Sequence, residues 1–291
     1  MNSKILVTGC RGQLGTALCR VLTPDYEIAG VDIDNLDITD AEAVARYMDK
    51  CRPAVVVNCA AWTAVDAAEA NPEACAALND TAVLTLCRES RRVGARLIHI
   101  STDYVFDGTA SVPYTEDDEP HPTTVYGRTK LAGERHVLDL MADDGIVVRT
   151  AWLYSTTGNN FVKTMLRLGA ERERLNVVVD QIGTPTAAID LAQAIATIIG
   201  SDTWQGGIYH YTDAGVASWY DFAVAIMELA GLPCRVMPIN SDEYPTPAAR
   251  PHYSVLDKHK IVATYGVEMP HWHESLRQCI AALSHPSQQK P

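Results

Sequence analysis

The stretch that decides the fold is Lys4-Ile-Leu-Val-Thr-Gly9-Cys-Arg-Gly12-Gln-Leu-Gly15. A run typical of a buried strand leads directly into a glycine-rich turn, and a helical pattern follows from Gly15 to Leu22. Glycines allow a tight turn and let backbone N–H groups approach a pyrophosphate at the positive end of the helix dipole. The pattern therefore predicts a dinucleotide-binding turn whose cofactor-binding residues are Gly9, Arg11, Gly12, Gln13, Leu14 and Gly15.

An acidic residue ends the next expected strand and bears on the choice of cofactor. Asp32 lies 20 residues beyond Gly12, where a carboxylate accepts hydrogen bonds from the adenosine ribose. A carboxylate at this place repels a 2′-phosphate and favours NAD, whereas Arg11 in the turn neutralises that phosphate and admits NADP. Because the two signals conflict, we expect the protein to use both NADPH and NADH.

Short β-branched runs alternate with helical patterns through the first half of the chain. This alternation predicts repeated βαβ units and a Rossmann-type, doubly wound parallel sheet of the α/β class. Strands are expected at Lys4–Thr8, Glu27–Val31, Ala54–Asn58, Arg96–Ser101 and Gly145–Thr150. Helices are expected at Gly15–Leu22, Ala41–Lys50, Asn71–Arg92 and Tyr126–Met141.

The pattern is looser after residue 150. We expect a helix over Phe161–Glu173, a strand over Leu175–Val179, and another helix opened by a Ser218-x-x-Asp221 capping box. Residues 1–150 should form the dinucleotide-binding core. Residues 151–291 should form mainly a smaller, partly interleaved substrate-binding lobe that returns to the core around 185–215.

Composition excludes several classes of partner. The 291 residues carry a net charge of −12. This balance argues against a positively charged surface that would attract nucleic acid or an anionic membrane. The eight cysteines show neither C-x-x-C nor paired zinc spacing, and we expect no metal site. With no apolar signal-peptide core and no apolar run of membrane-spanning length, we expect a cytoplasmic protein.

A tyrosine and a lysine stand four residues apart in Tyr126-Gly-Arg-Thr-Lys130. On a helix, positions i and i+4 share one face, so the lysine lies beside the phenol. A tyrosine ordinarily has a pKa near 10, and a neighbouring ammonium lowers it toward the working range of a proton donor. Downstream of a dinucleotide turn, this pair is the expected catalytic Tyr126 and Lys130, and both residues should also touch the cofactor.

A hydroxyl at the end of the strand beginning at Arg96 should complete the constellation. The sequence there is Ser101-Thr-Asp-Tyr-Val-Phe-Asp-Gly108. We assign Thr102 as the group that hydrogen-bonds the reacting carbonyl and stabilises its developing charge. Ser101 is the competing choice on spacing alone.

The glycine spacing and several downstream motifs carry a resemblance to a known family. The G-x-x-G-x-x-G turn resembles the extended branch of the short-chain dehydrogenase/reductases. The chain as a whole, from Ile5 to about Leu283, resembles the dTDP-4-dehydrorhamnose reductase family. The further motifs that carry this likeness are Arg149-Thr-Ala-Trp152-Leu-Tyr, Gly158-Asn-Asn-Phe161, Asp180-Gln-Ile-Gly-Thr-Pro-Thr186 and Arg250-Pro-His-Tyr-Ser-Val-Leu-Asp257.

The resemblance implies a substrate and roles for individual residues. The reaction is reduction of the C4 keto group of dTDP-4-dehydro-β-L-rhamnose, with Tyr126 as proton donor, Lys130 holding the nicotinamide ribose and Thr102 orienting the carbonyl. Asp103 and Trp152 match positions that contact the sugar, and Arg250 is a plausible ligand of the diphosphate. In such proteins Asp37 and Ile38 hold the adenine ring, and Ala60, Ala61 and Trp62 form the floor of the dinucleotide site.

Three other readings stay open. The related sugar 4,6-dehydratases carry Glu where this chain has Tyr104, which argues against dehydration. Epimerases share the Tyr/Lys pair. The family also resembles the regulatory β subunit of methionine adenosyltransferase, a dinucleotide-binding partner protein without catalysis, although Thr102, Tyr126 and Lys130 are intact here. The sequence leaves open whether the protein is a monomer or a homodimer.

Overall fold

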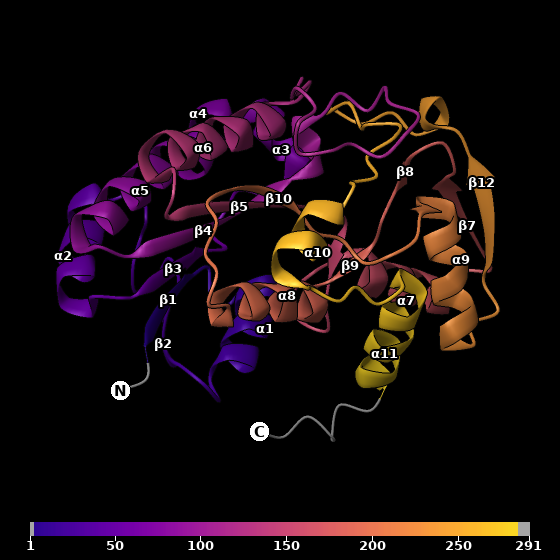
Figure 1. The fold of residues 1–291 in the computed structure, drawn as a ribbon. Helices are drawn as coiled ribbons and strands as arrows, with labels where there is room; N and C mark the ends of the chain where they lie inside the picture. The colour runs from indigo at the N-terminus through magenta and orange to yellow at the C-terminus, as the bar shows by residue number, and fades with distance from the viewer. Residues whose placement is uncertain (1–2, 285–291) are drawn as a thin grey trace.

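The computed structural model describes residues 3–284, which are built around a six-stranded, all-parallel sheet. From one edge to the other its strands are β10 (Gly207–His210), β5 (Gly145–Thr150), β4 (Arg96–Thr102), β3 (Val55–Asn58), β1 (Lys4–Thr8) and β2 (Glu27–Val31). The expected strands of the first half are confirmed to within one residue at each end. The edge strand β10 comes from the second half of the chain (Figure 1).

Helices cover both faces of the sheet. On one face α1 (Gln13–Leu22) packs against α8 (Ala188–Gly200), above Ile5, Val7 and Val57. On the other face α2 (Ala41–Cys51), α5 (Ala82–Val93) and α6 (Val125–Met141) cover the alternate residues Leu6, Val56 and Leu97. Because both faces are buried, these strands read as continuous apolar runs. The short α10 (His259–Tyr265) contacts β10.

The helix expected over residues 71–92 is confirmed, with a π-helical turn inside it and a separate short helix before it. The chain forms α3 (Val65–Ala70), restarts at Pro72 as α4 (Pro72–Ala76), widens into a π-helical turn over Ala77–Thr81 and continues as α5. Proline has no N–H and suits the first turn of a helix, so a new helix begins there. The π turn contains Asn79, a fully buried side chain whose hydrogen bonds lie outside the helix.

The second half adds a lobe beside the sheet, seen at the right of Figure 1. Its strands β7 (Arg174–Val178) and β12 (Arg235–Ile239) pair in parallel, and its helices are α7 (Phe161–Glu171), α9 (Trp219–Ala230) and α11 (Trp272–Ser284). The second half also contains two short strand pairs. β6 (Leu153–Tyr154) pairs in parallel with β9 (Thr186–Ala187), and β8 (Ile182–Gly183) pairs antiparallel with β11 (Ala217–Ser218). The strand expected at Leu175–Val179 is observed one residue nearer the N-terminus, as β7. The helix expected at Phe161–Glu173 is observed as α7, which ends two residues sooner. The Ser218/Asp221 capping box is confirmed.

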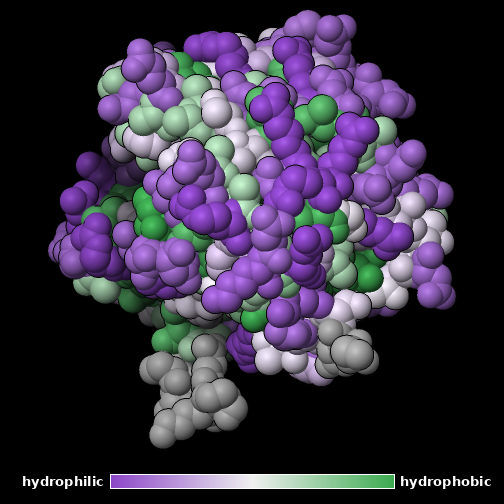
Figure 2. Space-filling view, turned by 90° about the vertical axis from the view of Figure 1, so that its left-hand side faces the viewer, coloured by the Kyte–Doolittle hydropathy of each residue, from purple (hydrophilic) through white to green (hydrophobic). Residues whose placement is uncertain are grey.

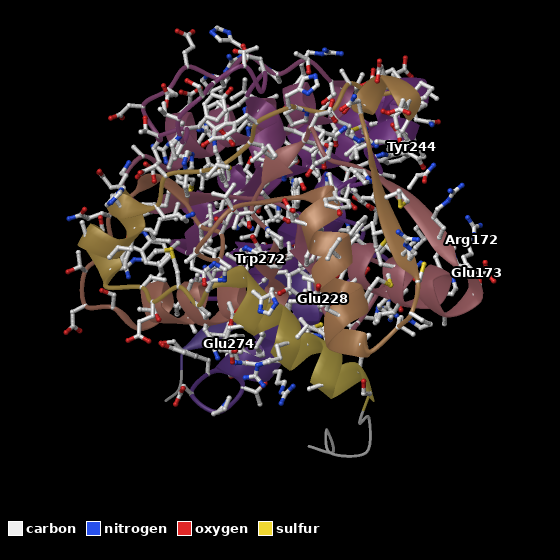
Figure 3. The ribbon with its side chains drawn as sticks, turned by 90° about the vertical axis from the view of Figure 1, so that its right-hand side faces the viewer. Arg172, Glu173, Glu228, Tyr244, Trp272 and Glu274 are labelled. Atoms are coloured by element: carbon white, nitrogen blue, oxygen red, sulfur yellow. The ribbon has the colours of Figure 1, made fainter. Side chains whose placement is uncertain are left out.

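Two views show the ends of the molecule. Figure 3 faces the second lobe, with Arg172 and Glu173 at the turn into β7 and Trp272 at the start of α11. Figure 2 faces the opposite side, a largely hydrophilic surface with scattered hydrophobic spots. Within residues 3–284, no helix has the length and apolarity needed to cross a bilayer.

Candidate active site

The glycine-rich turn joins the carboxyl end of β1 to α1 and comes close to the turn after β3. Gly9 has φ +61°, and a Cβ at this position would lie 2.8 Å from the backbone nitrogen of Ala60. The N–H of Gly12 donates to the carbonyl of Gly9 at 3.0 Å, which closes the turn. Only glycine combines this conformation with so close a neighbour. Glycine at this position therefore lets the turn pack directly against the backbone that follows β3.

A cavity of about 380 Å³ lies over this turn, at the carboxyl ends of β1, β2 and β3. The predicted cofactor residues that line it are Gly9, Arg11, Gly12, Asp32, Asp37, Ile38, Ala60 and Ala61. The lining residues that the sequence did not single out are Ile33, Leu36, Cys59 and Leu78. Ile33 is 75% exposed, an apolar side chain left open at the cavity mouth. An apolar wall beside carboxylates suits a base and its ribose.

Arg11 and Asp32, the two conflicting cofactor signals, contact each other. The backbone N–H of Arg11 donates to Asp32 Oδ2 at 3.0 Å, and Asp32 Oδ1 accepts from the N–H of Ile33 at 2.9 Å. The Arg11 guanidinium forms ion pairs with Asp32 and with Asp34. The carboxylate of Asp32 is thus fixed by backbone donors, and the exposed arginine is the movable member of the pair.

Other predicted cofactor residues face elsewhere. The Gln13 side chain accepts hydrogen bonds from Ser155 Oγ at 3.1 Å and Asn160 Nδ2 at 2.9 Å, so it links α1 to the second lobe. The Leu14 side chain lies in the core between the sheet and α8. At Gly15 a Cβ would collide with the carbonyl of Gly9, so this glycine serves the close packing of helix and turn.

Trp62 is held by the π turn. Asn79 Oδ1 accepts from the Trp62 N–H at 2.8 Å, and Asn79 Nδ2 donates to the Trp62 carbonyl at 3.1 Å. The same amide nitrogen reaches Thr129 Oγ1 at 3.3 Å, beside Lys130 on α6. Asn79 therefore fixes the segment after β3 against the helix that carries the tyrosine. No dinucleotide-binding motif in the sequence includes Asn79.

Thr102 and Tyr126 meet where β4 ends and α6 begins. Thr124 caps α6 by accepting from the Gly127 N–H at 3.0 Å, which places Tyr126 in the first turn. Burial raises the pKa of Tyr126 above its ordinary range, and a hydrogen bond with Thr102 opposes that rise. The i, i+4 spacing predicts that Lys130 lowers this pKa, but in the protein alone burial outweighs every other contribution and the pKa is raised. The phenol is therefore protonated at neutral pH, as a proton donor must be.

Ser101, the competing hydroxyl, is used in a structural network. It donates to Glu134 Oε1 at 2.5 Å, and the same carboxylate pairs with Arg149 at 2.9 and 2.7 Å. All three side chains are buried. A buried ion pair of this geometry needs its partners, so Ser101 is engaged there while Thr102 lies at the phenol.

Lys130 is buried and points to β4. Its Nζ donates to the Ile100 carbonyl at 2.6 Å and lies 3.3 Å from His99 Nε2. Burial lowers the pKa of Lys130 to about 8, while the charge of Glu134 opposes this change. Within residues 3–284 no carboxylate hydrogen-bonds the Lys130 amine.

Asp103 lies beneath the hydroxyl pair with one oxygen unpaired. Thr102 Oγ1 donates to Asp103 Oδ1 at 3.0 Å, whereas Oδ2 is buried and has no hydrogen-bond partner among the described residues. Burial raises the pKa of Asp103 to about 6, and the hydrogen bond from Thr102 opposes this rise. A buried acceptor without a donor is a place for a ligand hydroxyl.

Trp152 follows β5 in a strained conformation. Its φ is +49°, in the left-handed region that costs a non-glycine residue about 1–2 kcal/mol. Its ring stacks on Trp219 of α9, with centroids 3.6 Å apart and planes 8° from parallel. The stack fixes the indole at the junction of the two lobes, although Trp219 carries no local sequence signal that identifies it.

Arg250 pairs with a residue far away in the sequence. Its guanidinium donates to Asp66 Oδ2 at 2.7 Å, and Asp66 Oδ1 accepts from the Ala248 N–H at 3.1 Å. The pair ties the segment that contains Ala248 and Arg250 to α3. A ligand phosphate at Arg250 would compete with the Asp66 carboxylate. Asp66 also lies outside the residues that the sequence analysis named.

Comparison with known proteins agrees with this geometry. The RmlD substrate binding domain family matches residues 3–285. A dTDP-4-dehydrorhamnose reductase of Streptomyces griseus is 45% identical over 96% of this chain and 93% of its own, and a dTDP-4-keto-6-deoxy-D-glucose reductase of Streptomyces niveus is 42% identical over 98% and 99%. The crystal structure of dTDP-4-dehydrorhamnose reductase from Bacillus anthracis in complex with NADP is 39% identical, covers 97% of this chain and 99% of its own, and superposes with a TM-score of 0.93. The chain therefore belongs to the RmlD substrate-binding family.

Proposed function

We propose that this protein reduces the C4 keto group of dTDP-4-dehydro-β-L-rhamnose to give dTDP-L-rhamnose, with NADPH or NADH as reductant. The observation that carries the proposal is the pair of hydroxyls at the end of β4. The Thr102 side chain acts on the buried Tyr126 phenol by opposing the rise of its pKa, and Thr102 Oγ1 donates to Asp103 Oδ1 at 3.0 Å. A carbonyl oxygen placed between two hydroxyl donors is the requirement for reduction with protonation.

The residues present fit a dinucleotide. The 380 Å³ cavity is lined by Gly9 and Gly12 of the turn, and a Cβ at Gly9 would collide with the backbone of Ala60, which lines the same cavity. Asp32 offers a carboxylate to a ribose, and the exposed Ile33, beside the buried Leu36, offers an apolar surface to a base. We infer that Asp37, Ile38, Ala60 and Ala61 complete the cofactor site, with Trp62 held next to it by Asn79.

Side chains of the protein position the substrate and protonate its carbonyl oxygen. Thr102 and Tyr126 donate to the substrate carbonyl, and Tyr126 releases its proton to the oxygen as charge develops there. Lys130 supports the phenolate that remains and binds the nicotinamide ribose. When bound, the reduced nicotinamide supplies the hydride. Asp103 accepts from a sugar hydroxyl through its unpaired Oδ2.

The second lobe supplies the remaining substrate contacts. The stacked indole of Trp152 forms an apolar wall for the deoxysugar. Arg250 binds the diphosphate when its pairing with Asp66 is exchanged for phosphate, which a planar guanidinium binds well. We propose on this basis that residues 151–291 are mainly the substrate-binding lobe and that residues 1–150, joined by residues around 185–215, form the cofactor-binding core.

Both cofactors should be accepted because the arginine is movable. With Arg11 paired to Asp32 and Asp34, the ribose of NADH finds the Asp32 carboxylate as acceptor. For NADPH, Arg11 must turn from these carboxylates to the 2′-phosphate. A protein that consumes these reductants and a nucleotide sugar belongs in the cytoplasm, and we infer that location.

A second candidate substrate is favoured by one of the relatives. The Streptomyces niveus relative is named for reduction of dTDP-4-keto-6-deoxy-D-glucose, which differs in sugar configuration while the reacting group is still the C4 ketone. The Thr102–Tyr126 pair serves either sugar. Which one fits depends on the wall formed by Trp152 and on Asp103.

The test measures cofactor oxidation with each of the two keto sugars. The readout is the loss of absorbance of the reduced nicotinamide. Wild type is compared with Tyr126→Phe. The matched control is Tyr209→Phe, because Tyr209 lies in the edge strand β10 and its hydroxyl donates to the backbone carbonyl of Gln205, away from the site. We expect Tyr126→Phe to lose about 10²-fold or more in turnover with cofactor affinity unchanged. A wild type that binds cofactor yet reduces neither sugar would contradict the proposal and favour a regulatory dinucleotide-binding protein.

A further inference from the structure

Three polar side chains form a row across the apolar sheet. Thr8 of β1 is paired in register with Asn58 of β3, and Asn58 is paired with His99 of β4. All three side chains are buried, on the face that is covered by α6. Buried polar groups in such a place must satisfy one another. The row ends at Lys130, whose Nζ lies 3.3 Å from His99 Nε2.

The hydrogen bonds of the row have a direction. The 2.6 Å between Thr8 Oγ1 and Asn58 Oδ1 is a length typical of O–H···O, so the Thr8 hydroxyl donates to the amide oxygen. The amide nitrogen of Asn58 then faces His99 Nδ1 at 3.0 Å and donates to it. Burial lowers the pKa of His99 well below its ordinary value, so the ring is neutral. A neutral imidazole that accepts at Nδ1 carries its hydrogen on Nε2.

This hydrogen points at the lysine nitrogen. An ammonium has three donors and no lone pair, so it cannot accept from His99. An uncharged amine donates to the Ile100 carbonyl and accepts from the imidazole, which satisfies both contacts of Nζ. We propose that the row of Thr8, Asn58 and His99 presents an N–H donor to the Lys130 amine and thereby favours its uncharged form in the resting protein. His99 is then a positioning residue for the reaction proposed above, and this role rests on that function.

The other groups that face Lys130 do not reverse this preference. Glu134, one turn further along α6, favours the ammonium, but its carboxylate is bound by Arg149 through both oxygens. Cys59 and Cys75 also face the amine, and burial raises the pKa of Cys59 above its ordinary range, so that thiol is uncharged. Burial of Lys130 acts in the same direction as the row.

The row also connects the lysine to the cofactor site. Thr8 directly precedes Gly9 of the phosphate turn, and Asn58 directly precedes the Cys59–Ala61 segment that lines the same cavity. The protonation of Lys130 is therefore coupled by consecutive hydrogen bonds to two segments that hold the dinucleotide. We expect cofactor binding and the gain of a proton by Lys130 to be linked.

The test measures Lys130 directly, without turnover. The chain has seven lysines, so ¹³C labelling of the lysine ε-carbons gives few NMR signals, and Lys130→Arg identifies the one that disappears. We expect Lys130 to titrate below the ordinary lysine value in wild type. His99→Leu removes the donor and should shift the titration upward, by about a tenfold change in the protonation equilibrium. His99→Gln keeps an N–H donor and should remain near wild type.

The matched control is Ile98→Val, which trims the neighbouring residue on the opposite face of β4 and should leave the titration unchanged. If His99→Leu fails to fold, Asn58→Leu frees the imidazole to take the other tautomer and should shift Lys130 in the same direction. A folded variant whose Lys130 titrates at or below the wild-type pH would overturn the inference. Absence of sugar reduction by a wild type with the expected titration would instead contradict only the proposed function.

Discussion

Replacing Asp103 with asparagine should stabilise the protein while it impairs the reaction. The Asp103 side chain is 2% exposed, its Oδ2 has no partner within residues 3–284, and burial raises its pKa to about 6. At neutral pH the native protein therefore holds a carboxylate charge in an environment that resists it. Asparagine has the same shape without the charge, but it loses the acceptor that a sugar hydroxyl would use.

The size of the effect follows from the pKa. The difference between about 6 in the folded chain and about 4 in the unfolded chain corresponds to about 3 kcal/mol of folding free energy. Because the folded-state pKa of Asp103 is the higher one, its contribution to stability is full below the unfolded value and is lost as pH rises to about 6. Asp103→Asn removes that loss. We expect a gain of up to about 3 kcal/mol at pH 7, falling to about half of that at pH 5.

The assay is urea denaturation of wild type and Asp103→Asn at pH 5, 6, 7 and 8, with turnover measured on the same samples. Asp107→Asn is the matched control, since hydrogen bonds led by the Thr109 N–H lower the pKa of Asp107 and its replacement should destabilise at neutral pH. An Asp103→Asn protein that is less stable than wild type at pH 7, or a gain that is the same at pH 5 and pH 8, would refute this reasoning.

Three shorter predictions concern the cofactor and the sugar wall. Arg11→Ala should weaken NADPH binding about tenfold or more and leave NADH binding nearly unchanged, as measured by cofactor fluorescence; equal losses would contradict a phosphate-binding arginine. Gly9→Ala should abolish binding of both cofactors by pushing against Ala60, which calorimetry would show; retained binding would mean that the turn relaxes. Trp219→Leu should raise KM for the sugar with little change in kcat because Trp152 loses its stacking partner, and steady-state kinetics with unchanged KM would argue against this role.

The first half of the fold is predictable because its strands are buried on both faces. Such strands appear as unbroken runs like Val55–Val57, and their ends locate the polar residues that follow them. The cavity residues around Gly9 and Asp32 follow from the same logic, since parallel strands end at one edge of a sheet. Local sequence alone therefore places most of the predicted cofactor residues.

The rest of the site depends on contacts that local sequence does not encode. Asn79 lies in the π turn of a continuous helix, and its amide bonds the backbone of Trp62, 17 residues earlier. Asp66 meets Arg250 across 184 residues. The alignment of His99 with Asn58 depends on strand register, which becomes known only when the sheet is assembled.

β10 is synthesised after the other five strands of the sheet, and this order affects how the chain folds during synthesis. β5 is fully buried, and one of its two neighbours, β10, lies about 60 residues further along the chain. The core beneath α1 also needs Leu191 and Ile195 of α8 and Tyr209 of β10. A nascent chain that ends near residue 150 would leave β5 as an open strand edge and α1 without its packing partner, a state prone to aggregation. The nucleotide-binding half is thus a folding unit only after the ribosome has released segments from the second half.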